Sequence, residues 1–421
     1  MKILLAPVGS HGDVHPFIAI GRTMQQRGHE VVLITSEPFR ELAERQGFGF
    51  APTGTADDYE ALIHDPDLWH PTKALSVLFA GERPERLLRA AYAQIEAHYE
   101  RGNTVLLGGT LGLAARLAHE KLGIPFLSVH LQPSAILSIA DPPKFAMMTI
   151  PRWWPHWFRR ALFWYADRQV LDPMIAPAMD RLRADIGLKP IRRIFGPWRH
   201  SPQRLLAMYP GWYGPARDTP EHLRHVGFVH YDQEEQPLPD AVEAFLQAGS
   251  PPVVVSFGSA MRQGGPYFAA AVAAMKALNV RGLILAKAGS QIPADLPGTI
   301  LQADYVPFST VLPRCAAIIH HGGIGSAAQA MRAGLPQFLM PMAFDQPDNA
   351  ARLEKLGVAV TLPAPKFREP KVSMLLKKLL ETPSYREAAT KLRRTMLAEP
   401  DAESMVAAEI EDFCGKDVSV A

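Results

Sequence analysis

An apolar run, a glycine-containing loop, a helix-spaced segment and a second apolar run follow one another in both halves of this 421-residue chain. In the first half, "KILLAPV" precedes the loop, a helix is predicted from His15 with Gly28 as its C-terminal cap, and "HEVVLIT" is the next apolar run. Residues 316–342 repeat this order. Strands separated by a helical crossover pair in parallel. The sequence therefore predicts an α/β fold with parallel sheets.

The length of the chain favours more than one domain. The acidic, proline-containing stretch "YDQEEQPLPD" is the best linker candidate. We therefore expect two Rossmann-like domains, residues 1–230 and 231–400, that face a central cleft in which ligands bind. Residues 401–421 are predicted to add a helix that packs back towards the first domain.

Composition excludes several classes of protein. The formal net charge is +2, so no nucleic-acid partner is expected. Cys315 and Cys414 are the only cysteines, which fits a reducing compartment. No segment reaches the roughly 18 apolar residues of a membrane span, and the start is too short for a signal peptide. We expect a cytoplasmic protein, with peripheral contact to the inner face of the membrane left open.

The loop "HHGGIGSAAQ", residues 320–329, carries the strongest chemical signal. It follows a predicted strand and opens a predicted helix, where free N–H groups and the helix dipole favour phosphate. The candidate contacts are glycines that allow close approach and two polar side chains: Gly322, Gly323, Gly325, His321 and Ser326.

Two other interpretations of this loop stay open. It could be a plain glycine turn with histidines in the core. It also fits a loose dinucleotide fingerprint, Gly323-x-Gly325-x-x-Ala328, with Asp345 placed for a ribose contact. A nicotinamide site would leave the histidine pair at the strand end unexplained.

The motifs together resemble a known family. "HHGGIGSAAQAMRAGLPQFLMPMAFDQPDNA", "VVVSFGS" and "YVPFSTVLP" are similar to the donor-binding pieces of the family 1 nucleotide-sugar glycosyltransferases. "GSHGDVHPF" resembles the start of the sterol glucosyltransferases and of the antibiotic-tailoring enzymes. "DLWHP" and "RIFGPWRHSPQ" are similar to the rhamnosyltransferase catalytic chain of rhamnolipid synthesis. The resemblance implies the two-domain GT-B fold.

The same resemblance implies a donor site. Its residues would be Ser259, Tyr305, Pro307, His321, Gly323, Gly325, Ser326, Gln329, Asp345 and Gln346. The serines, glycines and His321 would hold the diphosphate, Tyr305 would stack on the nucleobase, and Asp345 with Gln346 would bind the sugar. Gln329 stands where many relatives have a glutamate that chelates the ribose, so uridine and thymidine both remain open.

In "HGDVH", the resemblance places Asp13 where a catalytic base is expected. Such a base takes the proton of the acceptor hydroxyl as it attacks the anomeric carbon. The alternative is a metal site of His11, Asp13 and His15, which would share a face in an extended chain. Gly12 and Pro16 instead indicate a turn into a helix, and no fourth ligand is apparent. We expect no metal and no cofactor.

Residues 151–168, "PRWWPHWFRRALFWYADR", mix tryptophans with arginines. Such a mixture suits a membrane interface, a helix packed over the first domain, or a lipophilic acceptor pocket. The candidate acceptor residues are His11, Trp69, Phe79 and Met147.

The expected activity is an inverting, metal-independent transfer of a hexose from a nucleotide sugar to a lipophilic acceptor. The donor is expected to be of the UDP-glucose type, and the acceptor a sterol, a lipid or a polyphenol-like molecule. One alternative is a dTDP-rhamnose-dependent rhamnosyltransferase of glycolipid synthesis. Another is a sugar-nucleotide epimerase or carbohydrate-binding protein on the same fold.

Overall fold

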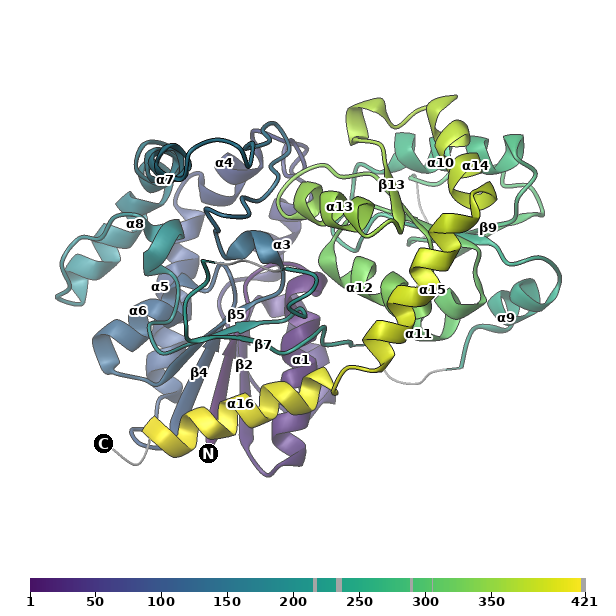
Figure 1. The fold of residues 1–421 in the computed structure, drawn as a ribbon. Helices are drawn as coiled ribbons and strands as arrows, with labels where there is room; N and C mark the ends of the chain where they lie inside the picture. Colours follow the sequence, from purple (N-terminus) through teal and green to yellow (C-terminus); the bar gives the residue numbers. More distant parts are fainter. Residues whose placement is uncertain (215–217, 232–236, 288–290, 305, 418–421) are drawn as a thin grey trace.

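The computed structural model describes residues 1–214, 218–231, 237–287, 291–304 and 306–417. The chain folds into two α/β halves that lie side by side (Figure 1). Each half is built on one sheet in which every pair of neighbouring strands is parallel. The predicted fold class is confirmed.

The first sheet has seven strands in the order β3-β2-β1-β4-β5-β6-β7. They are β1 Lys2–Ala6, β2 Glu30–Thr35, β3 Gly49–Pro52, β4 Thr104–Gly108, β5 Phe126–His130, β6 Arg204–Ala207 and β7 Leu223–His225. All residues of β1, β4 and β5 are buried. Continuous apolar runs form these strands because helices cover both faces of a parallel sheet.

The second sheet has six strands in the order β10-β9-β8-β11-β12-β13. They are β8 Val253–Ser256, β9 Gly282–Leu285, β10 Ile300–Ala303, β11 Ala317–His320, β12 Gln337–Leu339 and β13 Ala359–Thr361. In both sheets the chain moves outwards to one edge and then returns to the other side of the first strand. Ligands of such folds bind at this switch point, beyond the carboxyl ends of the central strands.

Helices cover both sheets. They are α1 His11–Gln26, α2 Arg40–Arg45, α3 Ala56–Ile63, α4 Ala74–Phe79, α5 Arg83–His98, α6 Leu113–Leu122, α7 His156–Tyr165, α8 Asp172–Asp185, α9 Asp240–Gln247, α10 Gly265–Ala277, α11 Phe308–Val311, α12 Ile324–Ala333, α13 Gln346–Lys355, α14 Lys371–Glu381, α15 Pro383–Leu397 and α16 Ala402–Asp417. Short 3₁₀ turns span Glu37–Phe39, Pro133–Ala135, Leu312–Arg314 and Ala364–Lys366, and π-helical turns span Ala166–Leu171 and Ile194–Trp198. Among the described residues, no helix combines the length and apolar character needed to cross a lipid bilayer.

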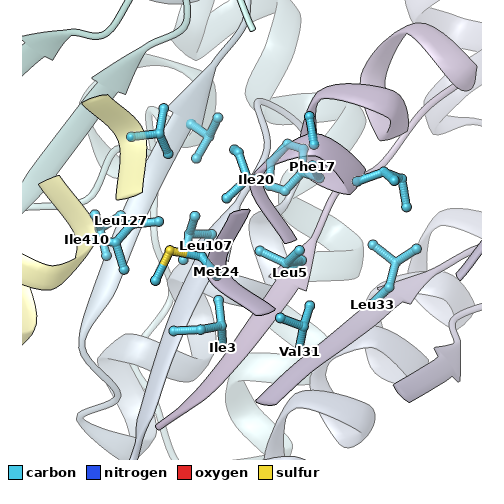
Figure 2. Packing of buried hydrophobic residues seen from close by; sticks show 14 of the residues in the cluster. Ile3, Leu5, Phe17, Ile20, Met24, Val31, Leu33, Leu107, Leu127 and Ile410 are labelled. Atoms are coloured by element: carbon cyan, nitrogen blue, oxygen red, sulfur yellow. The ribbon is translucent and has the colours of Figure 1, made fainter. Parts of the chain in front are cut away.

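The core of the first half includes side chains from the end of the chain. Ile410 of α16 packs in the same cluster as Leu5, Met24 and Leu127 (Figure 2). Figure 1 shows α16 crossing from the second half to lie along the first, beside α1.

Helix α1 begins four residues earlier than predicted, at His11 rather than His15. Ser10 caps the helix, and Asp13 completes a reciprocal capping box at its first turn. The prediction that the helix begins at His15 put Asp13 on the preceding loop, which is wrong. The acidic side chain three residues after Ser10 forms a capping box, and this stabilises a helix that begins at His11. The end was predicted correctly, since Gly28 follows the helix with φ +86°.

Candidate active site

Asp13 lies just beyond the carboxyl end of β1, the central strand of the first sheet. One carboxylate oxygen, Oδ2, accepts hydrogen bonds from the Ser10 amide at 2.8 Å and from the Ser10 hydroxyl at 3.3 Å. This geometry requires glycine at position 9, where φ is +143° and a Cβ atom would lie 2.1 Å from Asp13 Oδ2. The local sequence therefore fixes the orientation of the carboxylate.

Asp13 is near enough to Asp345, which belongs to the second half, for its charge to act on the Asp345 carboxyl. Burial raises the pKa of the Asp13 carboxyl to about 6, although the hydrogen bonds from Ser10 oppose the shift. Burial, followed by the negative charge of Asp13, raises the pKa of the Asp345 carboxyl to about 7. Two interacting carboxyls with pKa values near neutrality are typical of a functional site.

His11 and His15 share one face of α1, and Asp13 points elsewhere, because residues four apart align on a helix and residues two apart do not. The two imidazole rings meet edge to face with their centroids 5.2 Å apart. Burial lowers the pKa of both, that of His15 to about 3, so both are neutral. The extended geometry that a metal site would need is absent. Within the part of the chain that the structure describes, no group of three or more metal-ligating side chains occurs.

The glycine loop of the second half follows β11, which lies beside β8 at the centre of its sheet. His320 shapes this loop, because its Nδ1 accepts a hydrogen bond from the Gly322 amide at 3.2 Å and its Nε2 donates to Gln337 at 2.9 Å. Gly322 has φ +92°, which favours glycine. The histidine at the strand end therefore has a structural role.

His321 directly follows β11, at the carboxyl end of that strand. Burial lowers its pKa to about 4, so the ring is neutral, and Nδ1 is buried without a hydrogen-bond partner among the described residues. The ring packs close to Gly323, where a Cβ atom would lie 2.5 Å from Nε2. A buried ring nitrogen without a partner is unusual and is accounted for when a ligand supplies one.

The amino-terminal turn of α12 presents free amides next to His321. Gly323 is the N-cap residue, and the first backbone hydrogen bond of the helix runs from the Ala327 amide to the Gly323 carbonyl at 3.1 Å. The amides of Gly325 and Ser326 precede this bond and have no partner within the helix. A Cβ atom at Gly325 would meet nothing within 4 Å. This turn offers open backbone donors to an anion.

The remaining donor candidates differ in how deeply they are buried. Ser259 is exposed on the loop after β8, and its carbonyl accepts a hydrogen bond from Arg262 at 2.9 Å. Gln329 is partly buried on α12, and Pro307 is buried as the N-cap residue of α11. Tyr305 lies outside the described residues.

The start of α13 contributes Asp345 as the N-cap residue and Gln346 as the first helical residue. The buried Gln346 side chain is turned inward, since its Oε1 accepts hydrogen bonds from the backbone amides of Met342 and Ala343 at 2.9 and 3.4 Å. Asp345 Oδ2 accepts a hydrogen bond from Asn349 Nδ2 at 2.6 Å. Asp345 is therefore better placed than Gln346 to present an oxygen to a sugar.

Asn349 is a site residue that the motif analysis missed. Its amide group is fully buried and also donates to the Gly322 carbonyl at 3.0 Å, so it ties the glycine loop to Asp345. Its hydrogen-bonded neighbour Tyr213 comes from the first half, with 3.3 Å between the Tyr213 hydroxyl and Asn349 Oδ1. A buried asparagine one helical turn after Asp345 was the available signal.

The four acceptor candidates differ in their contacts. Trp69 comes from the first half but contacts the second: its Nε1 donates to the Ala260 carbonyl at 3.4 Å, and its ring lies 6.5 Å from His321 and 5.7 Å from Phe344. Phe344 adopts φ +58°, an uncommon conformation, directly before Asp345. Trp69 thus covers the phosphate end of the candidate donor site.

The other three acceptor candidates have different neighbours. His11 lies against Phe39, with 4.9 Å between ring centroids. Phe79 packs on Phe195 at 5.5 Å, within the first half. Met147 is 70% exposed on the surface.

Comparisons with known proteins agree with this geometry. Residues 3–140 match the model of the glycosyltransferase family 28 N-terminal domain, and residues 275–412 match the erythromycin biosynthesis protein CIII-like C-terminal domain. The chain is 30% identical to glycosyltransferase GtfE of Amycolatopsis orientalis over 87% of each chain. It is 29% identical to O-mycaminosyltylonolide 6-deoxyallosyltransferase of Streptomyces fradiae over 96% of each chain.

The chain belongs to the family 1 nucleotide-sugar glycosyltransferases. It is a glycosyltransferase, as the motifs of the donor site indicated, and of the macrolide and glycopeptide type. Solved structures share the GT-B fold: the glycotransferase of kitacinnamycin has a TM-score of 0.73 and 21% identity, over 98% of this chain and 99% of that one. Glycosyltransferase SsfS6 of Streptomyces sp. SF2575, complexed with thymidine diphosphate, has a TM-score of 0.65 and 20% identity, over 98% and 99%.

Proposed function

We propose that this glycosyltransferase moves a hexose from a uridine or thymidine diphosphate donor to a hydroxyl group of a lipophilic acceptor, with inversion and without a metal ion. The observation that carries the proposal is that the Asp13 carboxylate, on the first half, acts electrostatically on Asp345 of the second half, which Asn349 ties to the glycine loop. A base and a phosphate-binding turn from opposite sheets then face one reacting centre.

Asp13 would act as the general base. Its Oδ2 is held by Ser10, whereas Oδ1 has no hydrogen-bond partner among the described residues. Oδ1 would take the proton of the acceptor hydroxyl while the hydroxyl oxygen forms a bond to the anomeric carbon. A pKa of about 6 makes this carboxylate a stronger base than an ordinary aspartate and leaves it mostly ionised at neutral pH.

The bond that breaks joins the anomeric carbon to the diphosphate, and the nucleoside diphosphate leaves with the electron pair. The developing negative charge would be met by the amides of Gly325 and Ser326, the positive end of the α12 dipole, and an N–H of His321. These donors make a metal ion unnecessary. One displacement at one carbon inverts its configuration.

Several observations support the identity of the substrates. The thymidine diphosphate in the SsfS6 complex and the deoxysugar named for the tylonolide enzyme support a thymidine donor. Uridine stays in the proposal because Gln329 holds a ribose less selectively than a glutamate. The aromatic residues of 151–168 support a lipophilic acceptor and peripheral contact with a membrane.

The test is product analysis with purified enzyme. Thermal-shift measurements with UDP, dTDP and their sugars come first, because a ligand that binds only the folded state raises its stability. The stabilising donor is then incubated with sterol, hydroxy-fatty-acid and polyphenol acceptors in the presence of a chelator. A new glycoside of inverted anomeric configuration is expected. Donor epimerisation, or donor binding without a glycoside from any acceptor, would contradict the proposal.

A further inference from the structure

Large apolar side chains gather on one exposed segment of the first half. Of the fourteen that are exposed among the described residues, eight lie between residues 147 and 170: Met147, Met148, Trp153, Trp157, Phe158, Trp164, Tyr165 and Val170. We call residues 144–170 the aromatic surface. Figure 1 shows its helix, α7, at an outer edge of the first half. A patch of this kind on a folded chain marks an interaction site.

Helix α7 exposes large aromatic side chains that an ordinary surface helix would bury. Trp157 and Trp164, seven residues apart and therefore on one face, are 71% and 48% exposed. Arg159 and Phe163 lie on the opposite face and are buried. The guanidinium of Arg159 donates to the Ala140 carbonyl at 3.4 Å. The aromatic face of α7 is left to the solvent.

The rings of the aromatic surface support one another. Trp154 lies edge to face with Trp153 at 6.2 Å and with Phe158 at 5.0 Å, and Trp157 lies against Phe158 at 5.7 Å. These contacts restrict the side chains before any partner binds. Less conformational entropy is therefore lost on binding.

The charge of the aromatic surface has one sign. The only acidic residue in it is Asp167, which is buried. Four of its five basic residues reach the surface: Lys144, Arg152, Arg160 and Arg168. Arg152 is paired with Asp141 and Arg168 with Asp172, so Lys144 and Arg160 are the cations that form no ion pair with any described residue. The exposed surface is therefore aromatic and cationic.

We propose that the aromatic surface docks the enzyme on a lipid bilayer that contains anionic headgroups. Tryptophan and tyrosine rings settle at the headgroup level of a bilayer, and each arginine or lysine near the surface adds electrostatic attraction to anionic lipid. A helix of ten residues that lies in the plane of the interface presents Trp157 and Trp164 to the bilayer and Arg160 to its headgroups.

The aromatic surface is connected to the candidate active site. The amide of Lys144, at its beginning, donates to Asp348 Oδ1 of α13 at 3.0 Å, three residues after Asp345. Met147 and Met148 follow directly. Docking therefore brings the edge of the site to the bilayer, and the acceptor would be an amphiphile that resides there. This last step rests on the lipophilic acceptor of the proposed function.

The test is co-sedimentation of the full chain with phosphatidylcholine vesicles, with and without 30 mol% phosphatidylglycerol. The aromatic variant is Trp157→Ser with Trp164→Ser, and its matched control is Met374→Ser with Leu397→Ser, two exposed positions of the second half. The charge variant is Arg160→Glu, matched by Arg368→Glu, which is also exposed. The affinity of each variant for the nucleotide, measured by calorimetry, reports an intact fold.

We expect the wild type and both controls to bind the anionic vesicles, more weakly at high salt. Arg160→Glu should reduce binding about tenfold, and the aromatic variant should abolish it, with unchanged nucleotide affinity. Absence of vesicle binding, equal binding to phosphatidylcholine alone, or a concentration-dependent dimer lost in the aromatic variant would overturn the proposal. Transfer to a water-soluble acceptor is a separate measurement, so failure to dock and failure of the proposed function are distinguishable.

Discussion

The two oxygens of the Asp13 carboxylate are placed for different roles. Oδ2 closes the capping box of α1 through Ser10, and Oδ1 is left for the substrate. One side chain therefore stabilises the start of a helix and supplies a base at the end of the central strand. A substitution of Asp13 that tests its role as a base therefore has to keep the hydrogen bond that caps the helix.

Asp13→Asn meets that condition, because an amide oxygen can still accept the hydrogen bond from Ser10 but cannot take up a proton at neutral pH. We expect kcat to fall by about 10²–10⁴-fold, the usual effect of losing a general base. Donor affinity should stay within about threefold, since Asp13 does not contact the phosphate-binding turn. Steady-state kinetics and nucleotide calorimetry measure the two quantities.

The chain contains a matched control for this variant. Asp58 closes the same capping box at the start of α3, where it accepts a hydrogen bond from the Thr55 amide at 3.1 Å. Asp58→Asn should lower stability slightly and leave kcat unchanged. An equal loss of kcat in both variants would mean that Asp13 acts through the helix start and is not the base.

The rate should depend on pH in a direction set by Asp13. Burial raises the pKa of its carboxyl to about 6, and only the ionised form can accept a proton. We therefore expect kcat/KM to be constant above about pH 7 and to fall up to tenfold per pH unit below about pH 6. The interaction with Asp345, whose pKa is raised to about 7, should broaden the fall. A flat profile down to about pH 5 would exclude a base with the raised pKa of Asp13.

Trp69 should affect the donor more than the acceptor. All its ring contacts and its hydrogen bond are made with the second half, next to His321. We expect Trp69→Ala to weaken nucleotide binding about tenfold, equivalent to about 1.4 kcal/mol. Phe79→Ala is the control, because Phe79 packs on Phe195 within the first half. If Trp69→Ala changed only the KM for the acceptor, Trp69 would be an acceptor-site residue, as the sequence predicted.

At the scale of residues, the position of the glycine loop and of Asp13 beyond the carboxyl ends of strands was predictable, because residues that directly follow an apolar strand lie at the end of its sheet. The role of Asp13 as a base came from the family resemblance and stays a prediction. The sequence did not separate Trp69 from Phe79, since their partners Ala260 and Phe195 are far away in the chain. It also could not show that the Gln346 side chain turns inward.

At the scale of elements, α16 supplies the core of the first half with residues from the end of the chain. Val406, Ile410 and Phe413 are buried with Leu5 and other residues of the first sheet. Polar contacts add to this packing: Arg27 Nη1 lies 2.7 Å from Glu411 Oε2, and Arg204 pairs with Glu409. The last helix therefore stabilises the half that is synthesised first.

We expect Ile410→Ala to lower the free energy of unfolding by about 2–5 kcal/mol, because the removed methyl groups leave a cavity among fully buried side chains. Met405→Ala, at a position of the same helix that is 37% exposed, should change it by less than about 0.5 kcal/mol. Urea unfolding followed by circular dichroism measures both. Equal effects would show that α16 is loosely attached.

Most strands and helices were predictable from apolar runs and helical spacing. The start of α1 was not, because Ser10 and Asp13 cap it before the apolar pattern begins. The orientation of α7 was not predictable either. Such predictions assume that apolar residues face the core, whereas α7 exposes most of its aromatic residues and buries Arg159.

At the scale of the whole molecule, Arg352 of α13 joins the two halves. Its Nε lies 2.7 Å from Asp348 on the same helix, its Nη1 lies 3.5 Å from Asp141 of the first half, and Nη1 donates to the Tyr213 carbonyl at 3.2 Å. The guanidinium and Asp348 are both largely buried. These contacts lie one to two helical turns from Asp345, so they also fix the distance between the base and the donor.

Arg352→Gln should therefore weaken the contact between the two halves, so that they no longer unfold together. Removing one partner from a buried ion pair costs about 3–5 kcal/mol, because the remaining carboxylate stays buried without a countercharge. We expect an early thermal transition to separate from the main one, and kcat to fall about tenfold or more because Asp13 no longer faces the donor at a fixed distance.

The matched control is Arg281→Gln. Arg281 stacks on Phe245 with its guanidinium 4.1 Å from the ring centroid and donates to the Ser250 carbonyl at 2.7 Å, and both partners lie in the second half. Its loss should lower stability within one transition and leave kcat unchanged at a temperature where the variant is folded. Differential scanning calorimetry and initial rates distinguish the two variants. If Arg352→Gln also unfolds in one transition and keeps its kcat, the distance between Asp13 and the donor is set by contacts other than those of α13.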